Sequence, residues 1–352
     1  MGSQAKHFSF VLLPRFNMMT MTTVMEPMRI ANYLASSELF TWDFRSSESG
    51  IVTASNGMEL SCKGLDECEP VTPDYVAVFG SWGAESYTSQ PLTNWLRRNA
   101  RNGSVLIGVE LGVYALARAK VLAGNPVTTH WSWKPGFAEE FPNVKVCEQL
   151  FTISKNIATC SGGTAGLDMM LQLIADESGE QLAIEISNQI MHYPRRAAES
   201  PQRYAAGAIA KDIHVTVREA MKLLEANVEE PFTVPEICQK LQVSQRTLER
   251  LFVRDTGCTI VQFSKLLRLQ YARVLLTSTR MSVREVSVAC GFNSLSYFSQ
   301  CFGAMFSKRP SEYRQAWPEN EAAPSWPGTV YSFINSAKDI GTSPGKFVDS
   351  QS

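Results

Sequence analysis

The feature that most constrains this chain is an internal duplication in its last third. A helix start at Thr233, with proline and glutamate in its first turn, leads through a turn into a second short helical pattern that begins at Ser244. The same apolar skeleton returns at an offset of 49 residues in the first helix and 50 in the second, which places a one-residue insertion beside Gly291. The matched apolar pairs are Ile237 with Val286, Leu241 with Cys290, Leu248 with Phe298 and Phe252 with Phe302. This repeat predicts an all-α domain with two helix-turn-helix units.

The second helix of each unit is expected to turn a polar face toward a groove of double-stranded DNA. On the first of these reader helices Arg246 and Arg250 lie four residues apart and point the same way, and arginine suits guanine edges and phosphates. The second reader helix has no basic residue before Lys308, so we expect it to act more through phosphate contact, van der Waals fit and DNA shape. The residues predicted to contact DNA are Gln245, Arg246, Glu249, Arg250, Leu295, Ser296, Tyr297, Ser299 and Gln300. The helix between the units, roughly residues 261–276, would separate the two reader helices by one turn of DNA, about 34 Å.

Residues 215–316 resemble the DNA-binding domain of the AraC/XylS family of bacterial transcription regulators. The matching positions are Gly291, Phe292, Tyr297, Phe298, Phe302, Pro310, Tyr313 and Arg314. Two positions depart from the family pattern: Ser307 stands where glycine is common before the Pro310 turn, and Gln300 stands where arginine or lysine is common. The resemblance implies sequence-specific binding to promoter DNA, with RNA polymerase as a partner and activation rather than repression as the outcome.

Charge is distributed unevenly along the 352 residues, although the formal net charge is only −1. Residues 211–317 carry +5, residues 1–210 carry −4 and residues 318–352 carry −2. A basic module on an acidic remainder fits phosphate binding by one end of the chain. The excess is modest, so charge supports the assignment of the duplicated units rather than carrying it.

Other features of the composition indicate a cytoplasmic protein without membrane contact. No apolar run reaches the roughly 20 residues that a membrane-spanning helix needs, and the N-terminus lacks the pattern of a secretion signal. The eight cysteines include no Cys-x-x-Cys pair, and the histidines are not clustered. We therefore expect reduced cysteines and no disulfide or metal site.

The first 200 residues alternate short apolar runs with helical patterns. Strands are expected at residues 8–13, 75–79 and 104–109, and helices at residues 21–34, 91–99 and from Leu111 onward. This alternation predicts a parallel sheet covered by helices on both faces, an α/β flavodoxin-like fold. Ligands of such sheets bind beyond the carboxyl ends of the strands, so we expect a site in the loops after Leu13, Phe79 and Val109, together with residues 128–133.

The loops at that edge hold the candidate ligand-binding residues, which are Phe16, Glu26, Trp82, Glu110, His130 and Trp131. Two of them have structural alternatives: Glu26 as the partner of a backbone amide in the turn at Glu110, and His130 as a core histidine. Trp131 and Trp133 alternate along an extended segment, so only one of them faces the site, and Trp133 is expected to pack in the core. Arg195 and Arg196, near the domain edge, are expected to solvate the linker.

Residues 7–195 resemble the ThiJ/PfpI superfamily, which has a glutamine-amidotransferase-like fold. The resemblance rests on Glu26, on the turn at residues 108–112, on residues 128–131 and on residues 161–168. In the enzymes of that superfamily the sharp strand-to-helix turn, or elbow, carries a cysteine nucleophile, whereas the elbow residue here is Glu110. A carboxylate cannot replace a thiolate in that attack. We therefore expect a sensor domain with no catalytic residue and no cofactor.

The combination of the two domains resembles the GlxA-like regulators. The acidic elbow residue and residues 54–58 are similar to the branch of these regulators that responds to quaternary amines such as glycine betaine or carnitine. A quaternary ammonium has no N–H group to donate, so aromatic faces and a nearby anion bind it. Phe16, Trp82 and Trp131 would supply the faces, and Glu26 and Glu110 would supply the charge of a small-molecule effector site.

These inferences divide the chain into a sensor domain (residues 1–200), a linker (201–214), a DNA-binding domain (215–317) and a disordered tail (318–352). The ThiJ/PfpI resemblance also implies a homodimer. Two rival hypotheses stay open. One is an amidase or hydrolase of the ThiJ/PfpI class tethered to DNA, against which the missing elbow cysteine argues. The other is a constitutive DNA-binding protein with a decayed sensor.

Overall fold

The computed structural model describes residues 5–67, 72–122, 124–202, 213–306 and 308–315. The chain divides into two compact units, residues 1–202 and 203–352, and each is described by itself. Most of the expected linker, Ser307 and the expected tail lie outside the described residues. Within the described ranges, no helix is both long enough and apolar enough to pass through a lipid bilayer.

The first unit contains one large sheet whose strands follow the order β3-β4-β2-β1-β5-β6-β10-β9. The strands are β1 (Lys6–Leu12), β2 (Phe40–Ser46), β3 (Gly50–Thr53), β4 (Glu59–Gly64), β5 (Tyr75–Gly80), β6 (Val105–Glu110), β9 (Phe151–Ile153) and β10 (Ile157–Cys160). The central strands pair in parallel, whereas β3 and β9 pair antiparallel at the two edges. Two short strands, β7 (Val127–Thr128) and β8 (Val146–Cys147), pair separately. The predicted parallel α/β sheet is confirmed.

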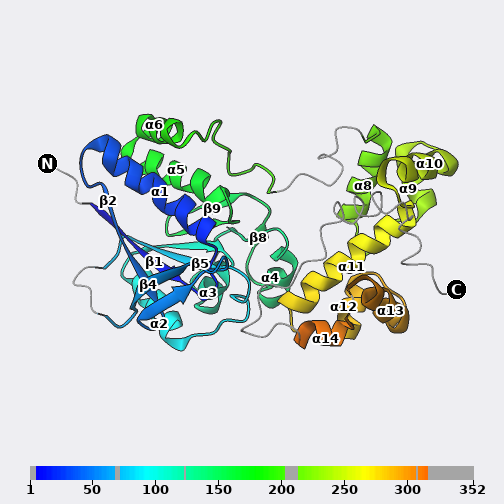
Figure 1. Ribbon diagram of the computed structural model, residues 1–352, viewed down its shortest axis with the longest axis horizontal. Coiled ribbons are helices and arrows are strands. Elements are labelled where there is room, and N and C mark those ends of the chain that lie inside the picture. Colours follow the sequence, from blue (N-terminus) through cyan, green and yellow to red (C-terminus); the bar gives the residue numbers. More distant parts are fainter. Residues whose placement is uncertain (1–4, 68–71, 123, 203–212, 307, 316–352) are drawn as a thin grey trace. The chain divides into compact units, whose positions relative to one another are not determined.

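Helices cover both faces of this sheet (Figure 1). On one face lie α1 (Met18–Ala35), α5 (Ala165–Ser178) and α6 (Glu180–Ile190); on the other lie α2 (Gln90–Arg101) and α3 (Val113–Arg118), while α4 (Lys134–Glu140) follows β7. Alternation along β1 serves both faces: Phe8 and Phe10 enter the apolar cluster of α1 and α5, and Val11 enters the cluster of α2 and α3. A strand buried on both sides is a nearly continuous apolar run, as in β5, all of whose residues are buried.

The second unit is helical and contains the two helix-turn-helix units that the duplication predicts. Its first group of helices is α8 (Val215–Ala226), α9 (Val234–Leu241) and α10 (Gln245–Thr256). Its second group is α12 (Val283–Ala289), α13 (Leu295–Phe306) and α14 (Pro310–Gln315). Between them, α11 (Ile260–Ser278) runs from one group to the other and contributes apolar side chains to both cores (Figure 1).

The duplicated positions have the same structural role in both groups. Thr233 with Glu236 caps α9, and Ser282 caps α12 in the same way with a glutamate three residues on, so that each helix start satisfies its own free amides. Leu248 and its counterpart Phe298 are both fully buried, each in the core of its own group. The apolar repeat therefore describes two separate small cores joined by one long helix.

Candidate functional site

The elbow residue Glu110 ends β6 and has a left-handed backbone, with φ of 57°. The turn into α3 is tight because the backbone of Gly112 approaches the neighbouring strand so closely that a Cβ there would lie 1.9 Å from the carbonyl oxygen of Val78. A non-glycine residue at positive φ is strained and persists only where the surroundings enforce it. The fold therefore holds the Glu110 side chain at the carboxyl edge of the sheet, where the sequence predicts the ligand site.

Hydroxyl groups surround the Glu110 carboxyl group. Thr20, in the first turn of α1, donates to Oε2 at 3.1 Å, and Ser81, just after β5, donates to Oε1 at 3.2 Å. The Thr129 hydroxyl donates to the main-chain oxygen of Glu110 at 3.0 Å. The residue is only 8 % exposed, and this burial raises the pKa of Glu110 to about 7, while hydrogen bonds from Thr20, Ser81 and Asn17 act in the opposite direction. Among the described residues, no cation contributes to that pKa.

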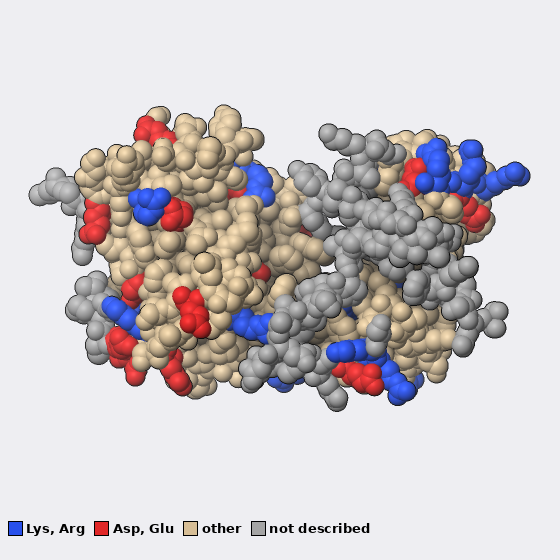
Figure 2. Space-filling model, in the orientation of Figure 1, with Lys and Arg blue, Asp and Glu red and all other residues tan. Residues whose placement is uncertain are grey.

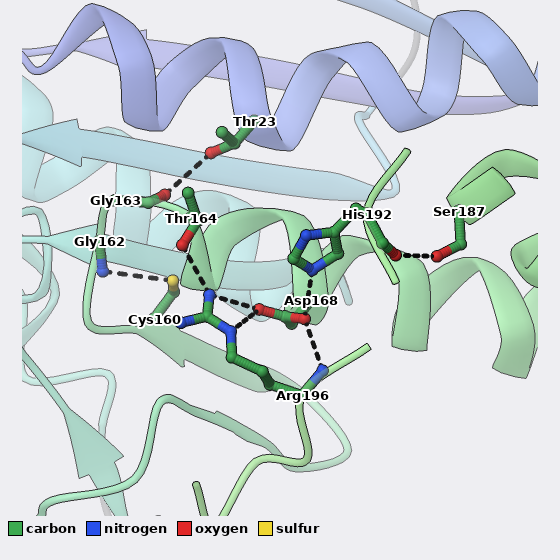
Figure 3. A network of polar contacts seen from close by, with 9 residues as sticks. All are labelled: Thr23, Cys160, Gly162, Gly163, Thr164, Asp168, Ser187, His192 and Arg196. Carbon is green, nitrogen blue, oxygen red and sulfur yellow. Dashed lines mark hydrogen bonds and ion pairs between the residues drawn. The ribbon is translucent and has the colours of Figure 1, made fainter. Parts of the chain in front are cut away.

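The turn at Gly162 and Gly163 closes the other side of the elbow. A Cβ on Gly162 would lie 2.9 Å from Cγ of Glu110, so only glycine fits against the carboxylate. The Gly163 amide donates to the Thr20 hydroxyl at 3.0 Å, and that hydroxyl in turn donates to Glu110. Cys160 lies behind this turn and accepts from the Gly162 amide (Figure 3), and burial raises the pKa of its thiol to about 12. This cysteine is therefore a neutral thiol rather than a thiolate nucleophile.

The structure does not bring Glu26 to the elbow. Glu26 lies on α1 six residues beyond Thr20, which corresponds to about 9 Å along a helix. Its carboxylate is 38 % exposed and pairs with Arg29 of the next helical turn at 2.7 Å. Thr20, rather than Glu26, is the α1 residue that contacts Glu110. The signal was available in part, because Asn17 is a helix N-cap and Thr20 is the residue whose amide it accepts from.

The aromatic candidates have different surroundings. Phe16 is fully buried in the apolar cluster of α1, and its main-chain oxygen accepts from the Ser55 amide at 2.9 Å. Trp82 is half-buried against the cluster of α2 and α3, whereas Trp131 is 41 % exposed. Trp133 is buried in the core, as expected.

His130 lies beside Trp131, with ring centroids 5.5 Å apart. Its Nδ1 is 2.7 Å from the Ser132 hydroxyl, and burial lowers the pKa of His130 to about 4, so the ring is neutral near pH 7. A shallow hollow of about 270 Å³ lies elsewhere, along α1 and α6, and its lining includes Arg29 and Tyr33 rather than the elbow residues.

The last part of the first unit, residues 191–202, is called the exit segment here because it precedes the DNA-binding unit. Asp168, fully buried in the first turn of α5, holds this segment (Figure 3). Its carboxylate accepts from the Arg196 amide and from Nε at 2.8 Å each, and it pairs with Nη2 at 2.6 Å and with His192 Nε2 at 2.7 Å. Arg196 also donates to the Thr164 hydroxyl at 2.7 Å. The expectation that Arg196 only solvates the linker is wrong, because the buried carboxylate requires a partner.

The end of the exit segment attaches beside the elbow. Gln202 Nε2 donates to the Thr128 hydroxyl at 2.9 Å, to the Thr129 oxygen at 3.0 Å and to the Gln149 oxygen at 2.8 Å. Thr129 is also the residue that holds the main chain of Glu110. Two short chains of hydrogen bonds therefore join the elbow to the exit segment. One passes through Thr129 to Gln202, and the other passes through Thr20 and the Gly162–Gly163 turn toward Thr164.

The first reader helix, α10, begins at the N-cap Ser244 and buries Leu248 and Phe252. Its predicted contact residues lie on the opposite side: Gln245, Arg246 and Arg250 are exposed, and Gln245 donates to Glu249 at 2.8 Å. Figure 2 shows basic side chains gathered where Figure 1 places α10. Arg254 continues the same four-residue spacing and is also exposed, with Asp255 as its partner at 2.6 Å. Arg254 is therefore a further candidate for contact with DNA, beyond the residues predicted from the sequence, and the four-residue spacing is the signal that identifies it.

The second reader helix, α13, exposes a surface without charge. Leu295 is 43 % exposed and Tyr297 is 48 % exposed, Ser296 and Gln300 are exposed, and Ser299 is half-buried. A cation of α11 lies beside this surface: the Lys265 ammonium is 5.6 Å from the centre of the Tyr297 ring. The predicted difference in charge between the two reader helices is therefore present on their surfaces.

Comparisons with known proteins agree with this architecture. Residues 11–176 match the DJ-1/PfpI family, and residues 237–316 match a helix-turn-helix domain. The chain is 37 % identical to the HTH-type transcriptional regulator CdhR of Pseudomonas aeruginosa, over 92 % of this chain and 96 % of CdhR. It is 36 % identical to GbdR of the same species, over 88 % of this chain and 84 % of GbdR. It is 31 % identical to GlxA of Rhizobium meliloti, over 88 % of this chain and 96 % of GlxA.

The chain belongs to the family of HTH-type transcriptional regulators that join a DJ-1/PfpI domain to an AraC-type DNA-binding domain. It is accordingly a DNA-binding transcriptional regulator, and its relatives of the same architecture carry the names of regulators rather than enzymes.

Proposed function

We propose that this regulator activates transcription in response to a small quaternary amine that binds at Glu110. The observation that carries the proposal is the buried carboxylate at the elbow, which has hydroxyl partners and no contributing cation among the described residues. A buried charge is costly unless it is paired. A cationic ligand would supply the missing partner, and a quaternary ammonium would do so without requiring a hydrogen-bond acceptor.

The aromatic residues near the same edge support this ligand class. Trp82 and Trp131 are both partly exposed in the loops that follow β5 and β7, so their indole faces can meet a ligand. Phe16 is buried and would act from beneath the site as packing. Because Glu110 itself is nearly inaccessible, we propose that these loops move apart when the effector enters. His130, neutral near pH 7, would add no competing charge.

The exit segment offers a route for the signal. A ligand that displaces Glu110 or Thr129 changes the anchor of Gln202, and a shift of the Gly162–Gly163 turn changes the position of Thr164, which holds Arg196. We propose that these two chains of contacts transmit effector binding to the segment that leads into the DNA-binding unit. Homodimer formation, contact with RNA polymerase and a cytoplasmic location complete the proposal.

An isosteric substitution tests the role of Glu110. Glu110→Gln keeps the size of the side chain and one oxygen that accepts from a hydroxyl, but removes its charge. We expect the affinity for glycine betaine or carnitine, measured by isothermal titration calorimetry, to fall at least tenfold, about 1.4 kcal/mol. Binding to operator DNA should be unchanged. The matched control is Glu26→Gln, which alters an exposed carboxylate on the same unit and should leave amine affinity within twofold. Equal amine affinities for the wild type and Glu110→Gln would refute the proposal.

The rival enzyme function has less support. An amidase or hydrolase of this fold needs a nucleophile at the elbow, and the nearby Cys160 is a buried, neutral thiol. We therefore propose that the domain is not catalytic. Measurable hydrolysis of amides or esters by the purified protein, lost in Glu110→Gln, would reverse this conclusion.

A further inference from the structure

The two helix-turn-helix units touch each other directly, in addition to sharing α11. Gly291, in the turn between α12 and α13, has a φ of 71°. A Cβ at this position would lie 2.8 Å from the carbonyl oxygen of Glu229 and 3.0 Å from Cδ of Pro231. Glu229 and Pro231 belong to the loop between α8 and α9, in the first group of helices. The chain of one unit therefore lies against the backbone of the other, with no room for a side chain between them.

Two residues of α11 hold the two sides of this contact. Arg268 donates from Nε to the Cys290 oxygen at 2.7 Å and from Nη2 to the Gly291 oxygen at 2.6 Å, and its guanidinium lies 4.0 Å from the centre of the Phe292 ring. Three residues further along α11, the Tyr271 hydroxyl donates to Glu229 Oε1 at 3.2 Å. Residues three apart are neighbours on a helix surface. One turn of α11 thus binds the second group of helices through Arg268 and the first group through Tyr271.

The position of the contact along α11 allows it to restrict bending between the two groups of helices. The core of the first group of helices uses α11 residues up to Leu267, and the core of the second group begins at Leu269. Among the described residues the two cores share no buried side chain, and the contact at Gly291 lies at their junction. Two bodies joined by a single helix can bend about it, whereas a second point of attachment restricts that bending.

We propose that Gly291, Pro231 and Arg268 are positioning residues that fix the separation and angle of α10 and α13. Each reader helix makes its own DNA contacts, and the contact at Gly291 decides how far apart the two contacted sites on DNA lie. Rigid placement of two binding heads raises the effective concentration of the second head once the first has bound. The same rigidity penalises DNA in which the two sites are displaced. The regulator therefore requires a set half-site spacing, and the requirement arises at this contact rather than on the reader helices.

The test measures spacing rather than affinity alone. Duplexes would be selected from a randomised DNA pool with the full-length wild-type protein, and one or two base pairs would then be inserted or deleted between the two recognised sites. For the wild type we expect each change of spacing to reduce affinity at least tenfold. Gly291→Ala and Pro231→Ala should bind the best duplex about tenfold more weakly, bind a duplex with one recognised site within twofold of the wild type, and lose less than threefold when the spacing changes.

Two controls separate positioning from folding and from base contact. Arg246→Ala should weaken binding at every spacing by the same factor, because it removes a contact without changing the relation of the helices. Pro231→Ala is a loop substitution and keeps the test valid if Gly291→Ala, at a positive φ, does not fold. The proposal is overturned if folded Pro231→Ala protein retains the spacing preference of the wild type. It is also overturned if its affinity for a single recognised site falls as much as its affinity for the full duplex.

Discussion

At the scale of the residue, Glu110 shows how a glutamate in place of a cysteine at the elbow changes what the site can do. The elbow geometry that presents a nucleophile elsewhere in the superfamily here presents a carboxylate with positive φ, close to Gly162 and to two hydroxyl donors. A carboxylate cannot replace a thiolate as the attacking nucleophile, but it can balance the charge of a bound cation. The strain at the elbow therefore fits a role in binding better than a role in packing.

Protonation of Glu110 makes a prediction about pH. Burial raises its pKa from 4.5 to about 7 in the folded state, so the folded protein binds more protons than the unfolded chain between these values. Stability is then favoured at the acid end of this window and is lost as pH rises through 7. Thermal melting of the ligand-free protein from pH 5 to 8 should show that Glu110→Gln gains on the wild type as pH rises. Glu85, with a pKa also raised to about 7, is present in both proteins and cancels in the comparison. Parallel curves would contradict the assignment.

Arg246 carries a residue-scale prediction for DNA. It is exposed on α10 on the side opposite the buried Leu248, so its loss removes a DNA contact without a cavity. Arg246→Ala should weaken specific binding by about 1–3 kcal/mol in a gel-shift titration. It should also reduce the slope of log K against the logarithm of the salt concentration by about 1. Lys222→Ala is a matched control, since Lys222 is an exposed cation of α8 that pairs with Glu219. Equal affinities of Arg246→Ala and Lys222→Ala would exclude Arg246 from the DNA interface.

At the scale of the element, the exit segment is held by polar contacts at His192, Arg196 and Gln202. The buried Asp168 carboxylate pairs with His192 and with Arg196 and also accepts from the Arg196 amide. Near the end of the segment, Gln202 donates to three oxygens. A segment bound in this way can transmit a change only when its anchors change. This gives the proposed signal a definite structural carrier.

A substitution at the end of the segment tests that carrier. Gln202→Leu removes all three donated hydrogen bonds while Asp168 and Arg196 stay paired. We expect amine affinity to remain within threefold of the wild type but the effect of the amine on operator binding to be lost. Hydrogen–deuterium exchange over residues 191–202 should rise in the variant to the level of the amine-bound wild type. A variant with normal exchange and normal amine response would remove Gln202 from the route.

At the scale of the whole molecule, the proposed effector and DNA must change each other's binding affinity by the same factor. If the amine raises operator affinity by some factor, the operator must raise amine affinity by the same factor, because binding free energies are linked. Coupling of this kind commonly amounts to about 1–3 kcal/mol. Calorimetric titration with glycine betaine, with and without operator duplex, should return the factor that gel shifts give with and without the amine. An amine that binds tightly but shows no coupling in either titration would favour a decayed sensor.

Some of this architecture follows from the order of residues alone. Alternating apolar runs predict the sheet, since a strand buried on both faces is apolar along most of its length. The repeat predicts the two small helical cores because each needs the same skeleton. The position of Glu110 at the elbow also follows, because a strand end and a following glycine are local signals. These features depend on neighbours that are close in the chain.

Other features depend on contacts between residues far apart in the chain, and only the tertiary structure decides them. It places Thr20 rather than Glu26 against Glu110, 90 residues away, because the register of α1 over the sheet edge selects which face of the helix meets the elbow. It pairs Arg196, which the sequence predicted to be a solvated side chain, with the buried Asp168. It also packs Pro231 against Gly291. Local sequence determined the elements and their polarity. The packing of distant backbone segments determined which side chains meet, because such meetings depend on helix rotation and loop path rather than on any periodicity along the chain.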